Sequence, residues 1–155
     1  MNELSDSVAN GFINAYRDYA RRAHALSEKL SEEQFWTKPY PYGNSFGHLT
    51  LHIIGNLSYY IGAQIAGTGY VRDREREFTE SAPPSKAEAL RRLDEAVEMV
   101  IATLEAQSAE SLSKAYVAEN LSDFVKDRFS IFLRCATHFH HHVGQMIYLE
   151  KEFSK

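Results

Sequence analysis

The chain has 155 residues, 44% of them hydrophobic, and a formal net charge of -4. This composition excludes a disordered chain, and it lacks the basic character of a nucleic-acid-binding protein. A chain of this length buries about two-thirds of its unfolded surface around one core, so we expect a single domain over residues 1–155. The partners that we expect are a small molecule and a second copy of the chain.

Cysteine content and hydropathy indicate the cellular compartment in which we expect the protein. The single cysteine, Cys135, excludes an intrachain disulfide and fits a reducing compartment. The segment Met1–Asp6 has no basic start followed by an apolar run. No stretch approaches the roughly 18 apolar residues that a membrane span needs. We therefore expect a cytoplasmic protein that makes no membrane contact.

Two helices are predicted in the first half of the chain. Over residues 4–30, hydrophobic side chains recur at steps of three and four, which is typical of an amphipathic helix. Pro39 and Pro41 then predict a loop, because each proline disfavours helical backbone in the residue before it. The second helix is expected over residues 46–66, with Ser45 as its N-cap.

Two further helices follow a charge-dense connection over residues 67–84, which is long enough to cross a bundle or to cover something. We expect one helix over residues 86–107 with Ser85 as its N-cap, and another over residues 123–153 with Ser122 as its N-cap. The last helix should supply much of the core, through Phe124, Phe129, Phe132, Leu133, Ala136, Val143, Met146 and Ile147. Four amphipathic helices without a credible strand predict an all-α four-helix bundle.

Six of the seven histidines lie in two short windows, one near residue 50 and the other near residue 140. Each helical residue turns the side-chain direction by about 100°, so His138 and His142 stand about 40° apart on one face. That pair can bind a single ion. His140 points to nearly the opposite side and His141 to the flank, so we expect neither to be a ligand.

A third nitrogen is expected from the first window. His48 and His52 repeat the four-residue spacing there, and spacing alone leaves the choice between them open. Three imidazoles with an open fourth position form a catalytic site for zinc or a similar divalent ion. Asn56 and Tyr59 follow on the same helix and suit an interior cavity. Gln145 is a comparable neighbour for the ligands on the fourth helix.

Several classes of metal site are disfavoured. No glutamate lies between His138 and His142, so the zinc-peptidase arrangement with a general base between two ligands is missing. No Glu-x-x-His pair lies on two helices, as a di-iron bundle requires. Cys135, one turn before His138, is interpreted as a buried inert thiol in preference to a fourth ligand. Lewis-acid activation of a water or a thiol remains.

Three stretches of the chain together follow the pattern of a known family. They are Asn44-Ser45-Phe46-Gly47-His48-Leu49-Thr50-Leu51-His52-Ile53-Ile54-Gly55-Asn56-Leu57, Gly69-Tyr70-Val71-Arg72-Asp73-Arg74-Glu75-Arg76-Glu77-Phe78, and His138-x-x-x-His142-Val143-Gly144-Gln145. These stretches resemble the DinB/YfiT-like superfamily of metalloenzymes. The resemblance implies a four-helix bundle, often dimeric, with a long connection between helices two and three. It also implies a metal triad of His52, His138 and His142, which favours His52 over His48, and nickel or zinc as the metal.

The same resemblance bears on function. Relatives include S-transferases and isomerases that use a low-molecular-weight thiol such as mycothiol, bacillithiol or glutathione, so a thiol is a candidate co-substrate. Arg72 has one candidate role, contact with an anionic substrate. We hypothesise a homodimeric, mononuclear metal-dependent transferase or hydrolase acting on a small electrophile, with its catalytic residues unassigned. The alternatives are a non-catalytic, stress-associated metal-binding bundle and a metal-free dimerisation module with an apolar stripe at Phe12 and Tyr16.

Overall fold

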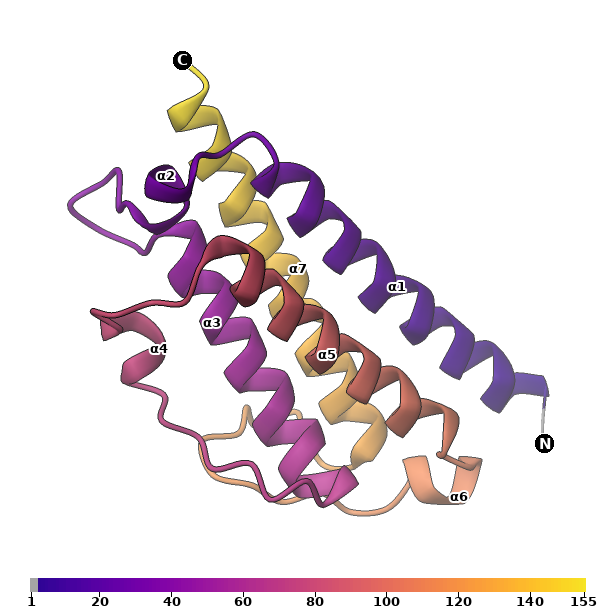
Figure 1. Cartoon of the computed structure of the whole chain (residues 1–155). Coiled ribbons are helices and arrows are strands. Elements are labelled where there is room, and N and C mark those ends of the chain that lie inside the picture. Colours follow the sequence, from indigo (N-terminus) through magenta and orange to yellow (C-terminus); the bar gives the residue numbers. More distant parts are fainter. Residues whose placement is uncertain (1–2) are drawn as a thin grey trace.

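The computed structural model describes residues 3–155, so Met1 and Asn2 of the N-terminal segment lie outside the described residues. Four long helical rods form a bundle (Figure 1). The rods are α1 (Glu3–Ser27), α3 (Phe46–Leu57) continued by the π-helix η1 (Ser58–Ala66), α5 (Lys86–Glu105) and α7 (Arg128–Phe153). Short helices α2 (Glu32–Trp36), α4 (Arg76–Thr79) and α6 (Ala109–Leu112) lie in the connections. Residues 3–155 contain no strand, which confirms the predicted all-α bundle.

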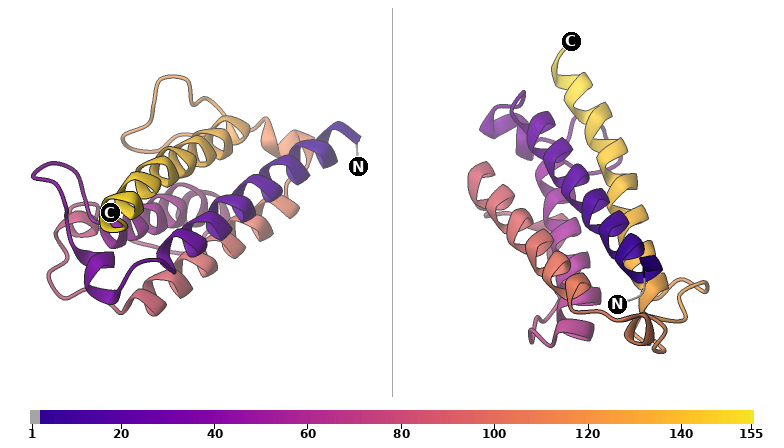
Figure 2. Two further views of the ribbon diagram at one scale, coloured as in Figure 1. Left: turned by 90° about the horizontal axis from the view of Figure 1, so that it is seen from above. Right: turned by 90° about the vertical axis from the view of Figure 1, so that its right-hand side faces the viewer.

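The direction of the rods explains the long connection. In Figure 1, α3 and α5 run the same way, while α1 and α7 run the other way. The chain must therefore return the length of the bundle between η1 and α5, and it does so along the outer side of α3, where α4 packs. The long connection expected between the second and third long helices is confirmed. Figure 2 shows the ends of the chain at opposite ends of the bundle.

Two predicted N-caps are confirmed. The Ser45 hydroxyl accepts a hydrogen bond from the His48 backbone N–H at 3.0 Å, and the Ser85 hydroxyl accepts one from the Glu88 N–H at 3.1 Å. Each bond satisfies a backbone donor that has no partner within its own helix. The second predicted helix also continues to Ala66, although its last nine residues form a π-helix.

The predicted start of the last helix is wrong. The helix begins at Arg128, and its N-cap is Asp127, which forms a capping box with Ser130. The preceding residues instead form a loop, held by the hydrogen bond from the Tyr116 N–H to the Lys126 carbonyl at 3.1 Å. Phe124 lies in this loop and is 55% exposed, so it is not a core residue.

The predicted core of α7 also needs correction at two positions. Phe129 and Leu133 are each 39% exposed, so they lie at the rim of the core, where Phe129 meets the Phe12 ring of α1 at 5.7 Å between ring centroids. On α1, by contrast, Tyr16 is fully buried and donates a hydrogen bond to the Phe132 carbonyl at 2.8 Å. Phe12 packs against the same core, so these two residues form no exposed stripe. Within residues 3–155, no helix is both long and apolar enough to cross a membrane.

Candidate metal centre

Three histidine rings meet between α3 and α7. His52 is 5% exposed on α3, and His138 and His142 project from one face of α7. The Nε2 atom of His138 lies 3.0 Å from His52 Nε2 and 3.1 Å from His142 Nε2. One ligand atom from each ring lies within 4.8 Å of the others, so the group could hold one metal ion. These are the three residues that the family resemblance implied.

Partners on the outer side of two rings fix which nitrogen carries the proton. His52 Nδ1 lies 2.7 Å from Glu77 Oε2, and His142 Nδ1 lies 2.7 Å from Gln145 Oε1. Because these oxygens accept hydrogen bonds, both Nδ1 atoms are donors. In the neutral form of each ring, the Nε2 atom then carries the lone pair and presents it toward His138.

This donor set fits a metal cation. A neutral His138 has at most one Nε2 proton to offer, yet two lone pairs face that atom. One ion among the three nitrogens would engage a lone pair from each ring. Zinc–nitrogen bonds of about 2.0–2.1 Å in tetrahedral geometry separate the nitrogens by about 3.3 Å, close to the 3.0 and 3.1 Å between the Nε2 atoms here. His138 Nδ1 is buried without a hydrogen-bond partner in the described chain, so the outer side of this ring is the least firmly held.

Burial keeps two of the rings in the form that binds metal. Burial, assisted by the neighbouring histidines, lowers the pKa of His138 to about 2. Burial also lowers the pKa of His142 to about 4, although the hydrogen bond with Gln145 acts in the opposite direction. Both imidazoles are therefore neutral at pH 7, and a neutral imidazole has the lone pair that coordination requires.

A buried carboxylate supports His52 from the long connection. Glu77, on α4, is 6% exposed and accepts a hydrogen bond from Arg72 Nε at 2.7 Å and another from the same guanidinium at 3.0 Å. Burial lowers the pKa of Arg72, but the hydrogen bonds and the charge of Glu77 outweigh it and raise the pKa overall. Gly55 permits this packing, because a Cβ atom there would overlap the Glu77 carboxylate. The connection thus brings a salt bridge against the metal centre.

His48, the alternative ligand, lies outside the group. Its Nδ1 is 2.6 Å from Ser45 Oγ, and its Nε2 is 3.2 Å from the Glu80 carbonyl oxygen. Burial lowers the pKa of His48. These contacts tie the start of α3 to the end of α4, so His48 supports the segment that carries Glu77.

The remaining histidines of α7 and the cysteine are not in the group either. His140 is exposed and stacks on Tyr19, with 5.0 Å between ring centroids. His141 is exposed and meets the edge of the His142 ring. Cys135 is fully buried, and burial raises its pKa to about 12, so its thiol stays protonated at neutral pH.

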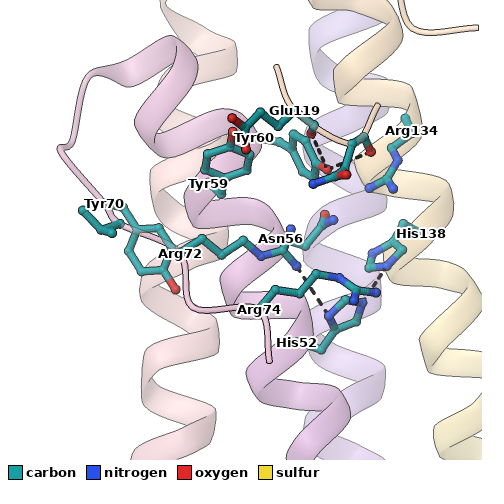
Figure 3. A pocket seen from close by; sticks show the side chains of 12 residues that line it. His52, Asn56, Tyr59, Tyr60, Tyr70, Arg72, Arg74, Glu119, Arg134 and His138 are labelled. Atoms are coloured by element: carbon teal, nitrogen blue, oxygen red, sulfur yellow. Dashed lines mark hydrogen bonds between the residues drawn. The ribbon is translucent and has the colours of Figure 1, made fainter. Parts of the chain in front are cut away.

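A cavity of about 690 Å³ opens beside His52 and His138 (Figure 3). The predicted residues Asn56, Tyr59 and Arg72 line it, and Gln145 does not, since it lies behind His142. The rest of the lining consists of Tyr60, Tyr70, Val71, Arg74, Glu119, Asn120 and Arg134. The Tyr60 hydroxyl lies 3.2 Å from the carbonyl oxygens of both Glu119 and Asn120, so the loop between α6 and α7 forms one wall.

A family model matches residues 15–146, which span most of α1 through most of α7 and include the three histidines. The chain belongs to the DinB superfamily. The family resemblance read from the sequence is thereby confirmed. A comparison with curated proteins found no match.

Three residues around the centre of this DinB-superfamily chain were not singled out from the sequence. Arg134 had a readable signal, because it lies one turn before His138 and shares its helical face. Glu77 lay inside the family-like segment but offered no spacing that pointed to His52. The role of Gly55 is visible only in the fold, because it depends on the tertiary contact between α4 and α3.

Proposed function

We propose that this chain is a metal-dependent enzyme that holds one divalent ion through His52, His138 and His142. The reaction proposed is transfer of a small thiol to an electrophilic small molecule, or hydrolysis of such a molecule. The proposal draws on the convergence of three imidazole nitrogens and on membership of the DinB superfamily, whose proteins bind metal.

The observation that favours catalysis is the cavity at the ligands. Structural zinc sites are closed by four protein ligands, whereas catalytic sites keep a position for water or substrate. Here three side chains form the group, and two of them, His52 and His138, also line a cavity of about 690 Å³. A volume of this size accommodates a small molecule beside the ligands.

Other residues of the chain would orient the side chains that hold the ion. Glu77 and Gln145 orient two of the rings through their Nδ1 atoms, and Arg72 holds the Glu77 carboxylate in place. A divalent ion with an open position supplies Lewis-acid activation of a water or a thiol. In the transfer reaction the thiol loses its proton, its sulfur bonds to the electrophilic carbon, and the leaving group departs with the bonding pair.

Metal content tests the site itself. We propose nickel or zinc as the ion, since imidazole suits both. Protein purified without a histidine tag should contain about one metal ion per chain by elemental analysis, as expected for a single three-imidazole site. His142→Ala should lose most of it, while His140→Ala, which alters an exposed ring of the same helix, should keep it. Equal metal content in all three proteins would remove the proposed site.

Activity tests the enzyme. The metal-loaded wild type would be screened for conjugation of small thiols to electrophiles and for ester hydrolysis, beside metal-free protein and His142→Ala. We expect turnover that needs both the ion and His142. If chelation lowers the melting temperature while every reaction stays blank with nickel and with zinc, the ion only stabilises the bundle. We also propose a homodimer, and sedimentation over a range of concentrations checks it.

A further inference from the structure

Two unsatisfied polar groups lie in the cavity on the same side of the metal centre. Asn56 follows His52 by one turn of α3, and Arg134 precedes His138 by one turn of α7. Because α3 and α7 run in opposite directions, both steps lead toward the same end of the bundle (Figure 1). Figure 3 shows both side chains beyond the histidines, next to Tyr60.

Arg134 is partly buried, and its guanidinium has no carboxylate partner among residues 3–155. Its NH1 atom is buried and has no hydrogen-bond partner, and its guanidinium carbon lies 5.0 Å from the centre of the Tyr60 ring. The ring favours a cation but does not engage the in-plane NH1 donor. A buried donor without a partner costs free energy, which a bound acceptor would recover.

Asn56 offers the complementary group. It is 2% exposed, and its Oδ1 atom is buried without a donor. The cavity therefore presents one unpartnered cationic donor and one unpartnered acceptor from facing helices. A molecule that fits both carries an anionic group together with a hydrogen-bond donor.

The other charged side chains of the lining are already engaged or exposed. Arg72 is bound by the Glu77 carboxylate, while Arg74 is exposed and lies over the Phe78 ring at 5.4 Å. Glu119 supplies the single carboxylate among the described lining residues, and it is exposed. The cavity is thus rich in positive charge although the chain has a net charge of -4. Among the described lining residues, Arg134 is the one guanidinium that is partly buried and lacks a carboxylate partner. Its single charge matches one negative charge, which favours a carboxylate over a phosphate group, whose charge is about -1.5 to -2.

We infer that this part of the cavity is a carboxylate subsite: Arg134 binds the carboxylate of the substrate, and Asn56 accepts a hydrogen bond from a neighbouring hydroxyl or N–H of the same molecule. Arg134 lies four positions before His138 on α7, a rise of about 6 Å, so both groups can reach one small molecule. The role of the subsite in a reaction rests on the proposed function. The binding of a carboxylate does not depend on it.

Binding is measured on metal-free, isotopically labelled protein by NMR titration. The probe is sodium lactate, which has a carboxylate beside a hydroxyl, and the neutral match is lactamide. We expect lactate to shift the amide signals of residues 56–60, 119–120 and 134, with a dissociation constant at least tenfold below that of lactamide. Arg134→Met should abolish that preference. Arg17→Met, which removes one exposed positive charge from α1, should retain it.

A second variant keeps the inference testable if Arg134→Met unfolds. Asn56→Asp keeps the side-chain size and places a carboxylate in the cavity, so it should weaken lactate binding at least tenfold. Equal affinity for lactate and lactamide, or lactate affinity unchanged in the folded variants, would overturn the subsite. A chain that binds metal but shows no lactate preference sinks this inference alone. A chain that prefers lactate but holds no metal sinks the proposed function and leaves the subsite standing.

Discussion

Glu77 Oε2 lies 2.7 Å from Nδ1 of His52, and each side chain is only 6% exposed. The carboxylate reaches His52 from the connection between η1 and α5, 25 residues along the chain. Such an outer carboxylate orients a ligating imidazole and raises its basicity. The long connection is therefore part of the candidate metal centre as well as a link between two parallel rods.

Replacing the carboxylate by an amide should weaken metal binding. We expect Glu77→Gln to lower the affinity about 10–100-fold, because a neutral amide is a poorer acceptor for the His52 Nδ1 proton. Competition with a chromophoric chelator measures the change. Glu75→Gln, an exposed position two residues earlier, serves as the matched control and should bind like the wild type. Indistinguishable affinities for the two variants would mean that Glu77 has no role in holding the ion.

The salt bridge between Arg72 and Glu77 should show strong coupling in stability. Their side chains are 10% and 6% exposed, so removing one partner leaves the other largely buried and unpaired. We expect about 3–5 kcal/mol of lost unfolding free energy for Glu77→Gln, and a smaller loss for the double variant with Arg72→Met. Urea unfolding of four metal-free proteins, namely the wild type, the two single variants and the double variant, gives the coupling free energy of this double-mutant cycle. Additive losses would show that the two residues do not depend on each other.

A single methyl group added at Gly55 of α3 should disturb the contact between Glu77 and His52. A Cβ atom at Gly55 would overlap Glu77 Oε1 and lie 2.6 Å from its Cδ. Gly55→Ala should therefore displace the carboxylate from His52 and lower both stability and metal affinity, although alanine favours a helix by about 1 kcal/mol over glycine. Gly144→Ala on α7, where a Cβ atom meets nothing within 4 Å, is the control for the helix propensity. Gains in stability for both variants would contradict the packing role.

The start of α7 can be tested by removing its cap. The Asp127 carboxylate accepts a hydrogen bond from the Ser130 N–H at 2.8 Å, so Asp127→Ala should cost about 1 kcal/mol of unfolding free energy. Ser122→Ala should change it by less than about 0.5 kcal/mol, because Ser122 caps no helix. Chemical denaturation gives both values. A larger loss for Ser122→Ala would restore the earlier helix start that the sequence suggested.

The fold could be predicted because its signals are local. Helical periodicity and the caps Ser45 and Ser85 depend on neighbours within a few residues, and they marked three of the four rods well. The expected start of the last helix is too early because Ser122, placed just before Phe124 and Val125, has the local pattern of an N-cap that precedes a buried face. Only the contact of residues 114–116 with residues 126–128 shows that the chain before Arg128 is a loop.

The candidate metal centre could be predicted from the sequence only in part. The i, i+4 spacing of His138 and His142 predicts a shared face, but nothing local separates His52 from His48. That choice came from the family resemblance. Glu77 became visible only in the fold, because its contact with His52 depends on where α4 packs on α3.

The metal-free protein should lose stability as the pH falls below 6.5. Burial holds the pKa of His138 near 2 and that of His142 near 4, both below the value of about 6.5 expected in the unfolded chain. Between these limits the unfolded state binds more protons than the native state, so acid favours unfolding, and the contribution is fully present only above about pH 6.5. Two such groups give a slope of about 2–3 kcal/mol per pH unit between pH 6 and 5, and His48, whose pKa burial also lowers, acts in the same direction. Urea unfolding at a series of pH values measures the slope. In His142→Gln the difference in bound protons between the unfolded and native states should fall by roughly one, so the slope should be shallower. A slope identical to that of the wild type would show that His142 is not held neutral by burial.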